Sequence, residues 1–101
     1  MGISISHGMP STRSATTIAN LGQHLAHALT SSEWREIAYL FDARRLDVPV
    51  STPPAKAARV SSLLTKAATH RSMDPDWAQL ATLLADSAQR AARAGETWEW
   101  T

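Results

Sequence analysis

The sequence of 101 residues contains no cysteine, which excludes two kinds of stabilising site. Neither a disulfide framework nor a zinc site built on thiolates can form. A chain of this length can bury one hydrophobic core without such cross-links. We therefore expect a single domain covering residues 1–101, and the lack of cysteine favours a cytoplasmic location.

Long apolar runs and an excess of one charge are also missing. No segment approaches the roughly 20 apolar residues that span a bilayer, and the start lacks the basic and apolar regions of a signal peptide. We therefore expect no membrane contact. The 10 basic and 9 acidic side chains leave a net charge of +1, which argues against a strongly basic nucleic-acid binder.

The common catalytic motifs are absent as well. The sequence contains no G-x-S-x-G, no phosphate-binding loop, no glycine-rich dinucleotide turn and no H-E-x-x-H. His24 and His27 have a spacing that can place two imidazoles on a metal, with His7 or His70 as a third ligand. No matching carboxylate motif accompanies them, so we interpret them as solvated histidines. We expect a non-enzymatic protein without metal or cofactor.

Among the features that are present, three short segments alternate between apolar and polar residues. The apolar pairs are Ile3 and Ile5, Val48 and Val50, and Trp98 and Trp100. Period-two alternation predicts a strand with one buried and one exposed face. In the second segment Pro49 cannot donate to a neighbouring strand, so that strand must bulge there or turn the proline outward.

Four amphipathic helices are predicted between these strands. The first covers about residues 15–29 after Ser14, and the second extends from Ser31 or Ser32 to near Arg44 and Arg45. The third begins at Thr52, with two prolines in its first turn. The fourth extends from the capping residue Asp74 to Gly95.

The order strand, two helices, strand, two helices, strand predicts an α+β fold. An antiparallel helix pair returns the chain to its starting end, so the second strand should oppose the first and the third should oppose the second. This order favours a three-stranded antiparallel sheet with four helices on one face. The other face would meet water or a partner, and it would carry Ser4, Ser6, Glu99 and Thr101.

A similar pattern occurs twice, as SSEWREIAYLF at residues 31–41 and DPDWAQLATLL at residues 74–84. The segments at residues 3–6 and 48–51 are also alike. One interpretation is ordinary amphipathic patterning in an alanine-rich chain, and the other is a duplicated strand–helix–helix unit. Under both interpretations Trp34 and Trp77 lie on apolar helix faces and are expected in the core.

The third helix carries a cluster of positive side chains, called here the basic stripe. It consists of Lys56, Arg59, Lys66, His70 and Arg71, and no acidic residue occurs between Val48 and Met73. Such a stripe can bind phosphate or an acidic protein surface, or it can be a solvated helix face. Reading of DNA by a helix-turn-helix is not expected, because the next helix begins with Asp74 and Asp76, which repel phosphate.

His7 is a further candidate, because it lies in SHG where the first strand ends and loops often carry function. Adjacent strand residues point to opposite faces, so the sequence does not imply a direct pair of Ser6 and His7.

The segments GISISHG, TIANLGQHLAHAL, EWR, LFDARRLDV and WEW together resemble a family of small actinobacterial proteins of unknown function. This resemblance covers nearly the whole chain. It implies a bacterial, cytoplasmic, single-domain protein, and it transfers no catalytic or binding residue.

Taken together, these features favour an interaction or regulatory module that binds another protein or a second copy of itself. The open sheet face or an edge strand would make that contact. The alternative is binding of nucleic acid or another polyanion through the basic stripe. The third hypothesis is a metal-dependent or histidine-based enzyme centred on His7.

Overall fold

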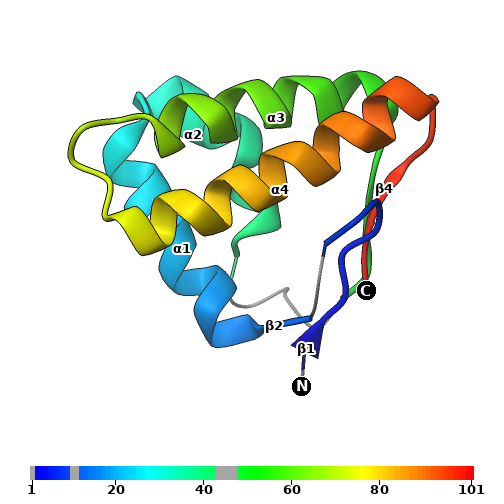
Figure 1. Ribbon diagram of the computed structural model, residues 1–101, viewed down its shortest axis with the longest axis horizontal. Helices are drawn as coiled ribbons and strands as arrows, with labels where there is room; N and C mark the ends of the chain where they lie inside the picture. The colour runs from blue at the N-terminus through cyan, green and yellow to red at the C-terminus, as the bar shows by residue number, and fades with distance from the viewer. Residues whose placement is uncertain (1, 10–11, 43–47) are drawn as a thin grey trace.

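The computed structural model describes residues 2–9, 12–42 and 48–101, and these residues form an α+β fold (Figure 1). The first half contains β1 (Gly2–Ile3), β2 (Arg13–Ser14), α1 (Ala15–Ala28), α2 (Ser31–Ile37) and the 3₁₀ turn η1 (Ala38–Leu40). The second half contains β3 (Val50–Thr52), α3 (Pro54–Ala68), α4 (Pro75–Ala94) and β4 (Trp98–Trp100).

The first and fourth helices begin and end close to their predicted limits. Ser14 precedes α1 and its side chain accepts a hydrogen bond from the backbone N–H of Thr17. Asp74 caps α4 in a similar way, and Gly95 ends that helix in the left-handed conformation with φ 68°. Local capping chemistry therefore sets these limits.

The second helix differs from its prediction. It begins after Thr30, which forms a capping box with Glu33, and α-helical geometry ends at Ile37, where η1 takes over. The predicted end near Arg44 and Arg45 lies outside the described residues.

The third helix begins two residues later than predicted. Thr52 lies in β3, is buried, and shares a 2.8 Å hydrogen bond with the Tyr39 hydroxyl. Thr52 and Pro53 each precede a proline, and this position disfavours helical backbone. α3 therefore starts at Pro54.

Two short antiparallel sheets replace the single predicted three-stranded sheet. β1 pairs with β2, and β3 pairs with β4 in the register Val50–Trp100 and Thr52–Trp98. A single antiparallel bridge, Ile5 with Trp100, connects the first segment to β4. Backbone hydrogen bonds from Ser6 to Glu99 and from Thr101 to Ser4 flank that bridge.

The predicted strand directions are half right. The third strand opposes the second, as expected, but the first segment also opposes the third and therefore parallels the second. The cause is a turn at His7 and Gly8 that reverses the chain into β2 before α1 begins. This additional reversal changes the direction that the helix pairs alone would give.

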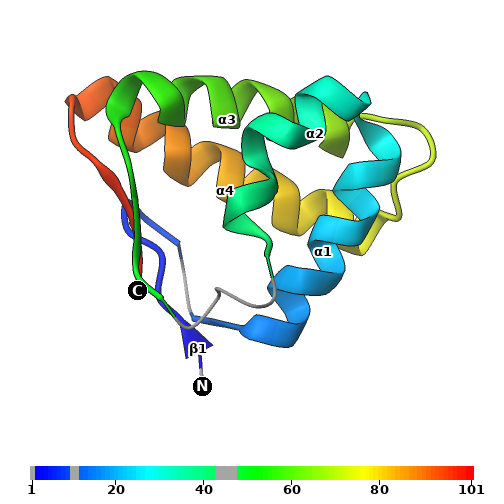
Figure 2. The same cartoon turned by 180° about the vertical axis from the view of Figure 1, so that it is seen from behind.

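The core lies between the helices and the paired strands, and all four helices lie to one side of those strands (Figures 1 and 2). Trp98 and Trp100 are buried at 0% and 2% exposure, while Glu99 between them is part-exposed. The predicted alternation in this strand is confirmed. The two indoles meet edge to face, with ring centroids 5.3 Å apart.

Trp34 and Trp77 are half-buried and pack against the core instead of lying within it. Trp34 stacks on Phe41, and Trp77 stacks on His24 of α1. The helices that carry Trp34 and Trp77 differ in length, with 7 and 20 residues. Because the two halves differ in this way, the duplicated unit stays a hypothesis.

Gly22 permits a close approach between α1 and the segment after η1. A Cβ atom at this position would lie 2.7 Å from Cβ of Phe41. Alanine favours a helix interior over glycine by about 1 kcal/mol, whereas overpacking costs about 1–3 kcal/mol. We expect Gly22→Ala to lower the free energy of unfolding by about 1 kcal/mol in urea denaturation. A stability gain would mean that Phe41 can move away from α1 without loss.

Candidate functional site

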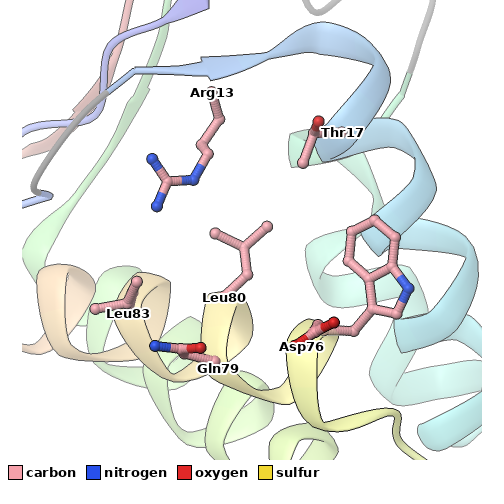
Figure 3. Close-up of a pocket in the computed structure, with 7 residues that line it drawn as sticks. Arg13, Thr17, Asp76, Gln79, Leu80 and Leu83 are labelled. Atoms are coloured by element: carbon pink, nitrogen blue, oxygen red, sulfur yellow. The ribbon is translucent and has the colours of Figure 1, made fainter.

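An open pocket of about 370 Å³ lies between the start of α1 and the first half of α4 (Figure 3). It is lined by Arg13, Thr17, Asp76, Trp77, Gln79, Leu80 and Leu83. Arg13 projects from β2 toward α4, Leu80 and Leu83 face it, and Asp76 lies at the other end. The volume is near the lower limit for sites that take small ligands or side chains.

The pocket combines an apolar surface with opposite charges at its ends. Leu80 is buried and Leu83 is partly buried, so these side chains are held by core packing. The Trp77 ring stacks on His24, with centroids 4.9 Å apart and planes inclined by 27°. Stacking limits the motion of the Trp77 side chain. This arrangement suits a ligand with an apolar body and an acidic group directed at Arg13.

None of the pocket residues was predicted as a site residue. Trp77 was expected in the core, Gln79 falls within the repeated pattern at residues 74–84, and Arg13 was given no role. The pocket forms only when β2 and the start of α1 pack over α4, which is distant in the sequence. No local pattern could have identified it.

The predicted basic stripe is largely paired with acidic residues. Arg59 donates two hydrogen bonds of 2.9 Å to the Glu36 carboxylate, and Lys66 pairs with Glu33. Both glutamates come from α2, which packs alongside α3. No acidic residue lies within the stripe's own segment of the sequence, but these two glutamates, distant in sequence, are adjacent to it in space.

The other residues of the stripe have separate surroundings. The Lys56 ammonium lies 4.3 Å from the centre of the Tyr39 ring, and the His70 ring bonds the hydroxyl and backbone N–H of Ser72. Arg71 is exposed in the loop after α3. The structure thus does not bring the five residues together as one cationic surface, and the polyanion hypothesis loses its main geometric support.

The two ion pairs should make stability sensitive to acid. Lys66 lowers the pKa of Glu33 from 4.5 to about 2, and Arg59 lowers the pKa of Glu36. Carboxylates with depressed folded-state pKa values stabilise the fold above their unfolded pKa of 4.5, and this contribution is lost as the pH falls toward 2. We expect the melting temperature at low salt to decrease over this pH range.

A double variant tests the assignment of that acid sensitivity. Lys66→Gln combined with Arg59→Gln removes both cations and should melt with a shallower pH dependence between pH 4.5 and 2. An unchanged pH dependence would contradict the assignment. High salt should also reduce the difference in pH dependence between wild type and this variant, because both ion pairs are near the surface.

His7 occupies a strained turn with both ring nitrogens bonded. Its φ angle of 62° is left-handed, which is uncommon for a residue other than glycine. The Ser6 hydroxyl lies 2.6 Å from His7 Nδ1, and His7 Nε2 lies 3.0 Å from Glu96 Oε1. The strand geometry that would point Ser6 and His7 apart does not apply, because these residues lie in a turn and not in a regular strand.

Other expected site features can be placed within residues 2–9, 12–42 and 48–101. No three histidine, aspartate or glutamate side chains there could hold a metal ion together. His24 and His27 are both exposed on α1, as predicted. None of the helices in this part of the chain has the length and apolarity that crossing a bilayer requires.

Comparison with known proteins gives a family without an assigned activity. A family model described as a domain of unknown function, DUF7739, matches residues 6–101. No curated protein and no solved structure matches the chain. The family match covers β2, β3, β4, the four helices and the pocket described above. The resemblance to a single-domain family of unknown function is thereby confirmed, and the chain belongs to the DUF7739 family.

Proposed function

We propose that this protein is a cytoplasmic interaction module that binds a protein partner through the pocket between α1 and α4. The partner would insert an apolar side chain next to an acidic one. The observation that carries this proposal is the pocket itself, in which Arg13 faces a surface formed by leucines and Trp77.

The chemistry of the pocket favours this occupant. A guanidinium binds a carboxylate through two parallel hydrogen bonds, and the indole and leucine side chains gain free energy when an apolar group displaces water. Trp and Arg are also the residues that most often dominate binding at protein interfaces. The pocket is open to solvent, which suits side chains presented on a protein surface.

Other surfaces offer less for the same role. Among the residues that the structure describes, β3 pairs with β4 on one side only; it is three residues long and is flanked by Pro49 and Pro53, neither of which can donate a backbone hydrogen bond. Pairing of edge strands between two copies is therefore restricted. Arg59 and Lys66 of the basic stripe already bind Glu36 and Glu33.

Selection of displayed peptides on the immobilised protein tests the proposal. We expect enriched peptides to carry Asp or Glu next to an aromatic or aliphatic residue. Synthetic versions should shift the indole N–H resonance of Trp77 in NMR spectra. The resonance of Trp98, whose N–H donates to Ser87, should stay in place.

Charge reversal at the pocket provides the matched comparison. Arg13→Glu should weaken binding of the selected peptides by at least about tenfold, which is about 1.4 kcal/mol. Arg93→Glu changes the charge equally on an exposed position near the end of α4 and should leave binding unchanged. Peptides that bind both variants equally, or that leave Trp77 unaffected, would refute the pocket as the binding site.

A further inference from the structure

Three groups that acyl-transfer enzymes use lie in one hydrogen-bonded chain at the end of α4. The Ser6 hydroxyl, the His7 imidazole and the Glu96 carboxylate are connected by contacts of 2.6 Å and 3.0 Å. An ionised Glu96 can only accept, so the proton on the ring belongs to His7 Nε2. His7 Nδ1 is then free to accept the proton of Ser6.

Further contacts hold the Ser6 hydroxyl in this position. The backbone N–H of Glu99 donates to Ser6 Oγ at 3.0 Å, and the Ser6 carbonyl accepts a hydrogen bond from Ser87. The Ser6 proton is therefore directed at the imidazole, and one lone pair on Oγ stays available. This is the arrangement of a nucleophile next to its base, with the base oriented by a third group.

Backbone strain and a nearby cation accompany this chain of groups. His7 has φ 62° and Gly8 has φ 94°, and strained backbone persists only where surrounding contacts enforce it. Arg90 covers the turn, with Nη1 3.4 Å from the His7 carbonyl oxygen. A Cβ atom on Gly8 would lie 2.0 Å from the same nitrogen, so glycine lets the guanidinium approach. Arg90 therefore places positive charge beside the turn that carries Ser6.

A second serine–histidine pair in the chain shows what is particular to Ser6. Ser72 Oγ also lies 2.6 Å from a histidine Nδ1, that of His70. In the described residues, no salt bridge or hydrogen bond connects Nε2 of His70 to a carboxylate. The two pairs have equal spacing, but only the Ser6 pair has a carboxylate that can stabilise the imidazolium.

We propose that Ser6 is an activated nucleophile that accepts acyl groups from small activated carboxylic esters. Ser6 Oγ attacks the ester carbonyl carbon while its proton passes to His7 Nδ1. The bond to the leaving oxygen then breaks, and that oxygen takes the proton from His7. Water, deprotonated by the same imidazole, subsequently releases the carboxylic acid and regenerates the hydroxyl.

Glu96 and Arg90 would assist this step electrostatically. His7 becomes positively charged while it holds the proton, and the Glu96 carboxylate favours that charge. The carbonyl oxygen becomes negative, and Arg90, which lies beside the turn, could stabilise it. This activity is independent of the pocket between α1 and α4.

The probe is 4-nitrophenyl acetate, with nitrophenolate release and acetylation measured together. Trypsin cleaves after Arg13 and Arg71, so Ser6 and Ser72 fall in different peptides, and fragment masses locate the acetyl group. We expect acetyl-Ser6 to accumulate and Ser72 to stay unmodified. Ser6→Ala should abolish that adduct.

Two substitutions test the roles of the neighbouring groups. His7→Asn retains a residue that tolerates positive φ and should slow acetylation at Ser6 by about 10²-fold or more, the usual contribution of a general base. Glu96→Gln, at an exposed carboxylate, should slow it less and alter its pH profile. Thermal melting confirms that each variant is folded. The control His70→Asn should leave acetylation of Ser6 unchanged.

The proposal is overturned if wild-type protein carries no acetyl group on Ser6. It is also overturned if Ser72 reacts as fast as Ser6, or if folded His7→Asn or Glu96→Gln reacts like wild type. Each of these results would mean that the hydrogen-bonded chain only holds the turn in place.

Discussion

Trp98→Ala should lower the free energy of unfolding by about 3–5 kcal/mol. Trp98 has no exposed surface, its ring meets Trp100 edge to face, and its indole N–H donates to Ser87 at 2.7 Å. The substitution removes the largest fully buried side chain of the described core. Domains of this size have stabilities of about 5–15 kcal/mol, so the variant should be near the limit of folding. Urea denaturation followed by far-ultraviolet circular dichroism measures the loss.

Trp77→Ala is the matched control for that experiment. It removes the same side chain from a half-buried position, where the indole lines an open pocket and stacks on His24. We expect its free energy of unfolding to fall by less than half as much as that of Trp98→Ala. Equal losses would show that Trp77 belongs to the core, as the sequence pattern alone suggested.

Ser87→Ala should be the second most damaging of the predicted changes. The Ser87 hydroxyl donates to the Ser6 carbonyl oxygen and accepts the indole N–H of Trp98. Alanine leaves both of these groups without that partner in a buried place, and each unsatisfied group costs about 1–3 kcal/mol. We therefore expect a loss of about 2 kcal/mol or more in the same urea assay.

Ser61→Ala provides the comparison for Ser87→Ala. Ser61 is also buried, but its hydroxyl only donates to the carbonyl oxygen of Ala85. Removing this hydroxyl leaves one carbonyl oxygen without that hydrogen bond and leaves no donor unpaired. We therefore expect Ser61→Ala to lower the free energy of unfolding less than Ser87→Ala does. If both serine variants lost the same stability, the bridging role of Ser87 between the turn and β4 would be refuted.

Much of the local structure could be predicted because its causes are local. Ser14, Asp74 and Gly95 set helix limits through bonds and backbone angles within a few residues. The helical periodicity and the alternation in β4 likewise report which face is buried. The start of α3 was misplaced although its cause is also local, because each residue before a proline is driven toward extended backbone.

Long-range arrangement was predicted less well. The turn at His7 and Gly8 adds a reversal that no periodicity indicates, so the first segment pairs with β4 in an unexpected direction. The residues of the basic stripe were read from the sequence, but the sequence pattern did not indicate that Glu36 and Glu33 from another helix pair with Arg59 and Lys66. The pocket around Arg13 was not predicted at all.

The sequence by itself determined the number and order of the helices, the limits of α1 and α4, the alternation of the last strand and a cysteine-free core. Each of these follows from interactions between residues a few positions apart or from total composition. Only the tertiary structure decided which strands pair, that Arg59 and Lys66 pair with glutamates of another helix, where a pocket opens, and that Glu96 reaches His7. These features depend on contacts between segments distant in the chain, and such contacts form only when burial of the core brings the segments together.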